Sequence, residues 1–181
     1  MEENSIITLV RAGNDDAFSE IINHYQTPII RYLYHLTGDY ELAQDLAQDT
    51  FVQAYKSILK TDSNLQFQSW LYKIATNNVW QHYRRKKLIS FIPFSAYHKI
   101  TPPVNETQME ILGKKIEIRK ALNKVPADQR ACIVLHFVEG FKYREIAETL
   151  GISEDAVRKR VARGKEAFRS NYNGGETNEL Q

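Results

Sequence analysis

Residues 143–165 of the chain are YREIAETLGISEDAVRKRVARGK, and the architecture of the C-terminal part follows from them. Ile146 and Leu150 lie one helical turn apart and indicate the inner side of a short helix. Gly151 follows at once, and glycine adopts the left-handed conformation that ends a helix at little steric cost. Ser153 can cap the free amides of the next helix. The stretch predicts two helices joined by a tight turn.

The second helix of this pair has two chemically different sides at about 100° per residue. An apolar inner side and a basic outer side suit insertion into the major groove of DNA, where arginine pairs with guanine and other cations hold phosphates. We therefore predict a DNA-binding helix-turn-helix; the alternative is an amphipathic helix with a solvated basic side. The apolar side carries Val157, Val161, Gly164 and Phe168, and the basic side carries Arg158, Lys159, Ala162, Arg163 and Arg169.

Length and composition limit the class of protein. The 181 residues allow one medium domain or two small ones, and a hydrophobic content of 43% supports packed cores. No stretch approaches the roughly 20 apolar residues that span a bilayer. The first ten residues carry no basic side chain, unlike a signal peptide. A single cysteine fits a reducing compartment, so we expect a cytoplasmic protein without direct membrane insertion.

The net charge of +2 conceals an uneven distribution. Acidic residues gather within residues 39–49, residues 84–87 are all basic, and residues 158–169 hold six basic residues and one acid. Separate charged segments predict separate surfaces for different partners, and the basic ones suit phosphate. Each run taken alone would also fit an ordinary solvated helix side.

Helical periodicity covers most of the chain, and no segment shows convincing strand alternation. Residues 88–106 break the pattern with three prolines, which indicates a linker. The fold class is therefore predicted to be all-α, with two small helical domains, 1–87 and 107–170, joined by a flexible linker at 88–106. The polar tail, 171–181, is expected to be disordered. Helices are predicted at 15–38 (kinked or divided at Pro28), 39–59, 67–87, 107–125, 127–138, 141–150 and 154–169.

The predicted helix 39–59 does not have a purely polar outer side. Leu42 and Leu46 lie beside a row of polar and acidic positions, Asp45, Asp49 and Gln53. Exposed leucines among carboxylates predict a docking site for a partner with basic residues. Alternatively, both leucines pack on a neighbouring helix of the same domain.

The predicted helix 67–87 combines aromatic and basic residues on its outer side. Rings interleaved with cations suit single-stranded nucleic acid, whose bases stack and whose phosphates need neutralising. Two alternatives remain: Trp70 lies at the edge of the core, and the basic run 84–87 only complements the helix dipole. The outer side carries Trp70, Lys73, Asn77, Trp80 and Arg84.

Taken together, these segments resemble the extracytoplasmic-function sigma factors, the minimal group of bacterial sigma factors. The resemblance covers about residues 5–170 apart from the linker, and the order and separation of its motifs make it specific. It implies a transcription initiation factor that directs core RNA polymerase to promoters and promotes DNA melting. The motifs are DLAQDTFVQAY (45–55), FQSWLYKIATN (67–77), VPADQR (125–130), YREIAETLGIS (143–153) and VRKRVARGK (157–165).

The resemblance also implies roles for individual segments. The helix around residues 45–55 is similar to the surface that grips a coiled coil of the polymerase clamp, and loop 60–66 to the pocket that takes a base flipped from the −10 element. Domain 1–87 then corresponds to sigma region 2, domain 107–170 to region 4, and the linker to a segment near the RNA exit path. The implied polymerase-binding residues are Leu42, Asp45, Leu46, Gln48, Asp49 and Gln53. The implied −10 residues are Lys60, Thr61, Asp62, Ser63, Asn64, Trp70, Lys73, Asn77, Trp80 and Arg84, and the −35 residues are Arg158, Lys159, Ala162 and Arg163.

The implied partners are core RNA polymerase, promoter DNA and an anti-sigma factor, which in some members of the family lies at the membrane. No cofactor or metal is implied. Two features depart from the family pattern. The linker is rich in aromatic residues (Phe91, Phe94 and Tyr97), and Ala162 leaves no long side chain at one position of the DNA-reading side.

Two other classes of protein compete with this interpretation. A helix-turn-helix regulator that never joins polymerase would explain the C-terminal half but not the outer sides of the two central helices. The sequence gives little support for the enzyme class. The five histidines show no metal-ligand spacing with one another or with Cys132, which lies in an apolar run. Neither a phosphate-binding glycine loop nor a nucleophile elbow occurs.

Overall fold

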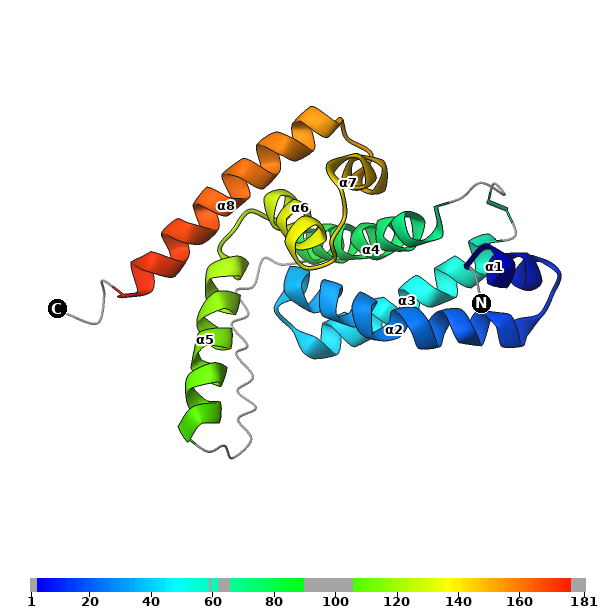
Figure 1. The fold of residues 1–181 in the computed structure, drawn as a ribbon, viewed down its shortest axis with the longest axis horizontal. Coiled ribbons are helices and arrows are strands. Elements are labelled where there is room, and N and C mark those ends of the chain that lie inside the picture. The colour runs from blue at the N-terminus through cyan, green and yellow to red at the C-terminus, as the bar shows by residue number, and fades with distance from the viewer. Residues whose placement is uncertain (1–2, 59, 62–65, 90–105, 177–181) are drawn as a thin grey trace.

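The computed structural model (Figure 1) describes residues 3–58, 60–61, 66–89 and 106–176. All secondary structure within these ranges is helical, which confirms the predicted all-α class. The elements are α1 (Glu3–Arg11), α2 (Asp15–Thr37), α3 (Tyr40–Ile58), α4 (Phe67–Ile89), α5 (Glu106–Asn123), α6 (Ala127–Phe137), α7 (Tyr143–Leu150) and α8 (Glu154–Glu176).

Local capping signals set the helix boundaries in the N-terminal half. The Asn14 side chain accepts a hydrogen bond from the Ala17 amide at 3.2 Å and opens α2, which continues through Pro28. Gly38 ends α2 with a φ of 73°, in the left-handed region that favours glycine. The Asp39 carboxylate then accepts from the Leu42 amide at 3.1 Å and opens α3.

Helices α1–α4 form the first domain. Their inner sides supply fully buried residues such as Ile29 and Leu33 of α2 and Leu71 of α4. A polar network joins α3 to α4: Gln53 donates to Asn78 at 3.0 Å, and Asn78 donates to Thr50 at 3.1 Å. Helix α1 is absent from the sequence prediction, and it packs Ile7 and Val10 into this core.

Helices α5–α8 form the second domain, in which α8 lies across α6 (Figure 1). The crossing is close because Gly164 has no side chain: a Cβ added there would lie 2.8 Å from Ile133 Cγ2 and 3.2 Å from the Gln129 carbonyl oxygen. The turn before α8 is as predicted. Gly151 adopts a φ of 66°, and Ser153 Oγ accepts from the Ala156 amide at 3.2 Å.

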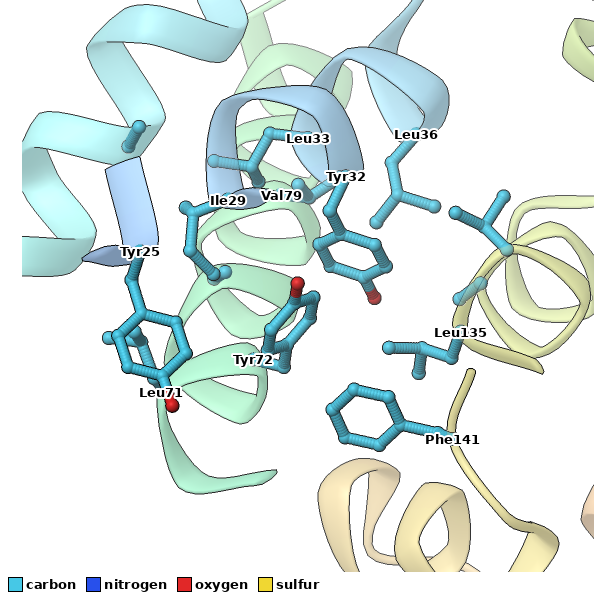
Figure 2. Close-up of a cluster of buried hydrophobic side chains, with 14 of the residues drawn as sticks. Tyr25, Ile29, Tyr32, Leu33, Leu36, Leu71, Tyr72, Val79, Leu135 and Phe141 are labelled. Atoms are coloured by element: carbon cyan, nitrogen blue, oxygen red, sulfur yellow. The ribbon is translucent and has the colours of Figure 1, made fainter. Parts of the chain in front are cut away.

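The two domains pack against each other. Helix α7 lies on α4, and α2 contacts α5 and α6. Figure 2 shows Leu135 and Phe141 of the second domain beside Tyr32, Leu36 and Tyr72 of the first. The buried residues of both domains thus belong to one continuous hydrophobic core.

Two predicted boundaries are changed by the structure. Helix α4 extends to Ile89 and α5 begins at Glu106, so the linker is shorter than predicted, and residues 90–105 with their aromatic side chains lie outside the described residues. The tail prediction is wrong for residues 171–176, which continue α8. Tyr172 stacks on Phe168 one turn earlier, with ring centroids 5.9 Å apart, and Asn171 donates to the Ala121 carbonyl of α5. Residues 177–181 lie outside the described part.

The close crossing of α6 and α8 predicts opposite effects for two glycine-to-alanine substitutions. Gly164→Ala forces Ile133 and the α6 backbone to shift, and should lower the free energy of unfolding by about 1–3 kcal/mol. Gly113→Ala in α5 meets nothing within 4 Å and should raise it by about 0.5–1 kcal/mol, because alanine favours the helix. Urea unfolding followed by circular dichroism measures both, and equal effects of the two substitutions would contradict the close crossing.

Candidate nucleic-acid and protein interfaces

Helix α8 presents the two sides that its sequence predicts. Val157 and Val161 are buried against the rest of the domain, and Gly164 lies at the crossing with α6. The four residues expected to read DNA, Arg158, Lys159, Ala162 and Arg163, are all exposed.

Two of these exposed cations already pair with acids one turn earlier in α8. Arg158 contacts Glu154 at 3.2 Å, and Lys159 contacts Asp155 at 2.8 Å. The hydrogen bond from Lys159 lowers the pKa of the Asp155 carboxyl. Exposed pairs of this kind contribute little to stability, so phosphate oxygens can replace the carboxylates at small cost.

Arg160 behaves differently from its basic neighbours in α8. Its guanidinium contacts Asp128 of α6 at 3.1 Å, and its side chain is half-buried. Arg160 therefore holds α8 on α6 and does not belong to the exposed basic side.

The outer side of α4 is less accessible than its sequence indicates. Lys73, Asn77 and Arg84 are exposed. Trp70 and Trp80 are partly buried and pack against the core. The centroid of the Trp70 ring lies 5.5 Å from that of the Phe67 ring. The tryptophans are thus core-edge residues that leave only part of each ring for a stacking base.

Loop 60–66 is described only at its two ends. Asp62, Ser63 and Asn64 lie outside the described residues, whereas Lys60 is exposed and Thr61 half-buried. Arg11 fixes the start of this loop: its guanidinium donates to the Thr61 carbonyl at 2.9 Å, to Thr61 Oγ1 at 3.0 Å and to the Ile58 carbonyl at 3.4 Å. Sequence reasoning missed this contact, because a single arginine 50 residues before its partner carries no periodic signal.

The outer side of α3 requires a correction. Asp45, Gln48, Asp49 and Gln53 are exposed as expected. Leu46, however, is only 6% exposed and belongs to the core, and Leu42 is half-buried against it, so the expected stripe of exposed leucines is wrong. The alternative, that the leucines pack within their own domain, holds because α3 is covered by both α2 and α4.

Apolar side chains are nevertheless exposed along another edge of α3. Val52 and Tyr55 are 45% and 44% exposed and border a groove of about 500 Å³ between α2 and α3. Gln48, one of the expected polymerase-binding residues, also lines this groove, so the acidic side and the groove are continuous. Its apolar lining includes Phe18, Ile22, Ile30, Phe51, Val52 and Tyr55.

The cysteine considered for enzyme chemistry lies in the hydrophobic core. Cys132 is fully buried in α6, and burial raises the pKa of its thiol to about 11. Among the residues that the structure describes, no three His, Cys, Asp or Glu side chains are placed to hold a metal ion. None of the described helices is long and apolar enough to cross a membrane.

Two family matches cover most of both domains. Residues 21–89 match the family described as Sigma-70 region 2, and residues 115–168 match Sigma-70, region 4. The first match begins after α1, so the helix that carries Arg11 lies outside it.

Relatives match over nearly the whole length of this chain. The ECF RNA polymerase sigma factor SigW of Bacillus subtilis is 32% identical over 173 residues, which cover 90% of this chain and 92% of SigW. The RNA polymerase sigma-H factor of Pseudomonas aeruginosa is 26% identical over 178 residues, covering 92% of each chain.

Two solved structures share the fold. CnrH in complex with the cytosolic domain of CnrY superposes with a TM-score of 0.71 at 21% identity, covering 95% of this chain and 97% of CnrH. RpoE in complex with the anti-sigma factor NepR from Bartonella quintana gives a TM-score of 0.67 at 24% identity, covering 85% and 95%. At these identities the likeness shows the fold alone.

The burial of Leu46 predicts that it acts on stability. Leu46→Ala should lower the free energy of unfolding by about 2–5 kcal/mol, because it removes buried methyl groups and leaves a cavity. Asp49→Ala, three residues later and exposed, should change it by no more than about 0.5 kcal/mol. Urea titration of both variants measures the difference, and a Leu46→Ala protein as stable as the parent would place this side chain at the surface.

Proposed function

Because this chain belongs to the extracytoplasmic-function sigma factors, which direct bacterial RNA polymerase to promoters, we propose that its two domains divide promoter recognition. The N-terminal domain, with helices α1–α4, docks on the polymerase and takes the melted −10 element. The C-terminal domain, with helices α5–α8, reads the −35 element as duplex, and residues 90–105 link the two. The observation that carries this proposal is the outward position of the basic side of α8 in a helix-turn-helix.

Within α8 the position along the helix distinguishes the two arginines. Arg158 lies in the first turns, which enter the major groove deepest, so it contacts base edges. Arg163 lies further along and contributes both base and phosphate contacts. Ala162 between them is exposed and short, which suits an apolar contact with a thymine methyl group.

The −10 strand is proposed to bind along the exposed side of α4. Lys73 and Arg84 neutralise phosphates there, and Asn77 offers hydrogen bonds to an unpaired base. The partly buried rings of Trp70 and Trp80 limit stacking to the ring areas that remain exposed. Capture of an unstacked base offsets the few kcal/mol that unpairing costs.

The polymerase is proposed to bind the exposed acidic side of α3. Asp45 and Asp49 attract a basic partner surface, and Gln48 and Gln53 supply neutral hydrogen-bonding groups. An anti-sigma factor is a proposed further partner, since RpoE, which shares the fold, is solved in complex with the anti-sigma factor NepR. The apolar groove between α2 and α3 has the lining that accepts side chains of an amphipathic partner helix.

We further propose that the protein catalyses no reaction of its own and works in the cytoplasm, where its polymerase acts. Bond formation then belongs to the polymerase, and the sigma factor contributes binding energy alone. Run-off transcription with core polymerase on a library of promoter fragments tests the whole proposal. Promoter-specific transcripts support it, whereas DNA binding without any stimulation of core polymerase would indicate a free helix-turn-helix regulator.

Charge reversal on α3 should weaken polymerase binding without unfolding the protein. Asp45→Lys with Asp49→Lys turns an attractive surface into a repulsive one, and should raise the Kd for core polymerase by at least about tenfold. Glu117→Lys, an exposed acid of α5, is the control for charge change alone. Fluorescence anisotropy with labelled protein gives both constants, and unchanged binding of a folded double variant would exclude this side as the docking site.

Alanine substitution separates the roles of the two arginines in α8. Arg158→Ala should lose roughly 1–3 kcal/mol of −35 binding and relax preference at one base pair. Arg163→Ala should weaken all sequences to some extent and lower the salt slope by up to about one. Binding to −35 variants across a salt series measures both effects. Parent-like binding of both variants to the wild-type and scrambled elements would show that α8 is not the reader.

A further inference from the structure

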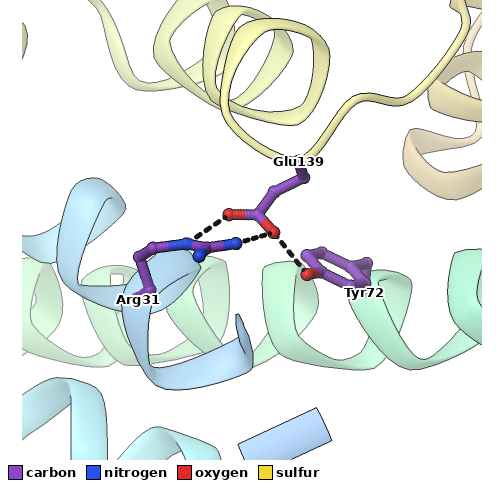
Figure 3. A network of polar contacts seen from close by, with 3 residues as sticks. All are labelled: Arg31, Tyr72 and Glu139. Carbon is purple, nitrogen blue, oxygen red and sulfur yellow. Dashed lines mark hydrogen bonds and ion pairs between the residues drawn. The ribbon is translucent and has the colours of Figure 1, made fainter. Parts of the chain in front are cut away.

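The contact between the domains contains an ion pair whose carboxylate is nearly buried, whereas its guanidinium side chain is 48% exposed (Figure 3). Glu139 lies in the turn between α6 and α7, and its side chain is 3% exposed. Arg31 of α2 donates to both carboxylate oxygens, at 3.2 Å and 2.9 Å, and the Tyr72 hydroxyl of α4 donates to one of them at 2.7 Å. One carboxylate of the second domain is therefore held by two helices of the first.

Apolar contacts surround this network. The buried ring of Phe141, two residues after Glu139, lies with its centroid 5.0 Å from that of Tyr72, and Leu135 of α6 lies beside it (Figure 2). At the other end of the contact, Arg119 of α5 donates to the Tyr34 hydroxyl of α2. The packing of α5, α6 and α7 on α2 and α4 is hereafter called the closed arrangement.

A carboxylate that is removed from water is stabilised only when charged or hydrogen-bonding partners contact it. Within the residues that the structure describes, both partners of Glu139 come from the other domain, 67 and 108 residues away along the chain. Loss of either partner leaves the carboxylate inadequately compensated and therefore weakens the closed arrangement, which the surrounding apolar contacts also support.

The closed arrangement cannot contact both promoter elements at once. Helix α7 packs on both α4 and α8, and because packed helix axes lie about 8–10 Å apart, α8 is no more than about 20 Å from α4. The −10 and −35 elements lie about 25 base pairs apart, roughly 85 Å of duplex at about 3.4 Å per pair. The domains must separate before both elements are bound.

We propose that Arg31, Tyr72 and Glu139 form an intramolecular latch that keeps the free protein closed and that core polymerase must open. This inference rests on the proposed function, because it is the two promoter elements that require separation. When only a small fraction of the molecules is in the binding-competent state, the apparent affinity for the partner is reduced by that fraction. Because polymerase would hold the two domains at the spacing of the promoter elements, complete docking requires the open state, and the latch lowers the affinity for polymerase. Arg31 and Tyr72 are not among the proposed polymerase- or DNA-binding residues.

Two latch variants and one control test the proposal in the full-length protein. Arg31→Ala removes the ion pair, and Tyr72→Phe removes only a hydroxyl group. The control is Arg160→Ala: its side chain is 34% exposed, against 48% for Arg31, and its ion pair with Asp128 lies within one domain. Circular dichroism first verifies that all variants retain their helix content, so that opening is distinguished from unfolding.

Small-angle X-ray scattering then reports the separation of the domains, and titration with core polymerase reports affinity. Both latch variants should have a larger radius of gyration than the parent and the control, and a Kd for core polymerase about five- to tenfold lower. A parent-like scattering profile of Arg31→Ala, or an opened protein with no gain in affinity, overturns the latch. If parent and variants alike fail to bind core polymerase, the proposed function and the latch's role in affinity both fall, while scattering still shows whether these residues hold the domains together.

Discussion

Removal of the Glu139 carboxylate from water is the constraint on which the arrangement of this protein depends. A charged group with a 3% exposed side chain requires compensation, and the Arg31 guanidinium and Tyr72 hydroxyl supply it from two different helices. The hydrogen bond with Glu139 raises the pKa of Arg31. Burial, together with the hydrogen bond to the same carboxylate, raises the pKa of Tyr72. The contacts of these three groups fix α2, α4 and the α6–α7 turn relative to one another.

The contact leaves the proposed working surfaces facing outward. The acidic side of α3, the exposed cations of α4 and the basic side of α8 all remain accessible in the closed arrangement. What the closed arrangement fixes is the distance between these surfaces. In a protein with two DNA-reading units, distance is as important as chemistry, because linked sites gain effective concentration only when their spacing matches the target.

Several elements were predictable from sequence because their signals are local. The turn before α8 needs only Gly151 and Ser153, which adopt the predicted left-handed conformation and cap. The two sides of α8 follow from periodicity alone. The errors concern packing partners: Leu46 shares a helix side with carboxylates but is covered by neighbouring helices, and Tyr172 extends α8 beyond the predicted end by stacking on Phe168.

The sequence by itself determined the helices, their caps, the basic side of α8 and, through its motifs, the family. These features depend on residues within one or two turns of each other, or on an ordered set of such segments. Only the tertiary structure decided that Arg11 anchors the loop after α3, and that Glu139 joins the two domains through Arg31 and Tyr72. The physical reason is separation along the chain: partners 50 to 108 residues apart meet only when whole helices pack, and no local pattern records that meeting.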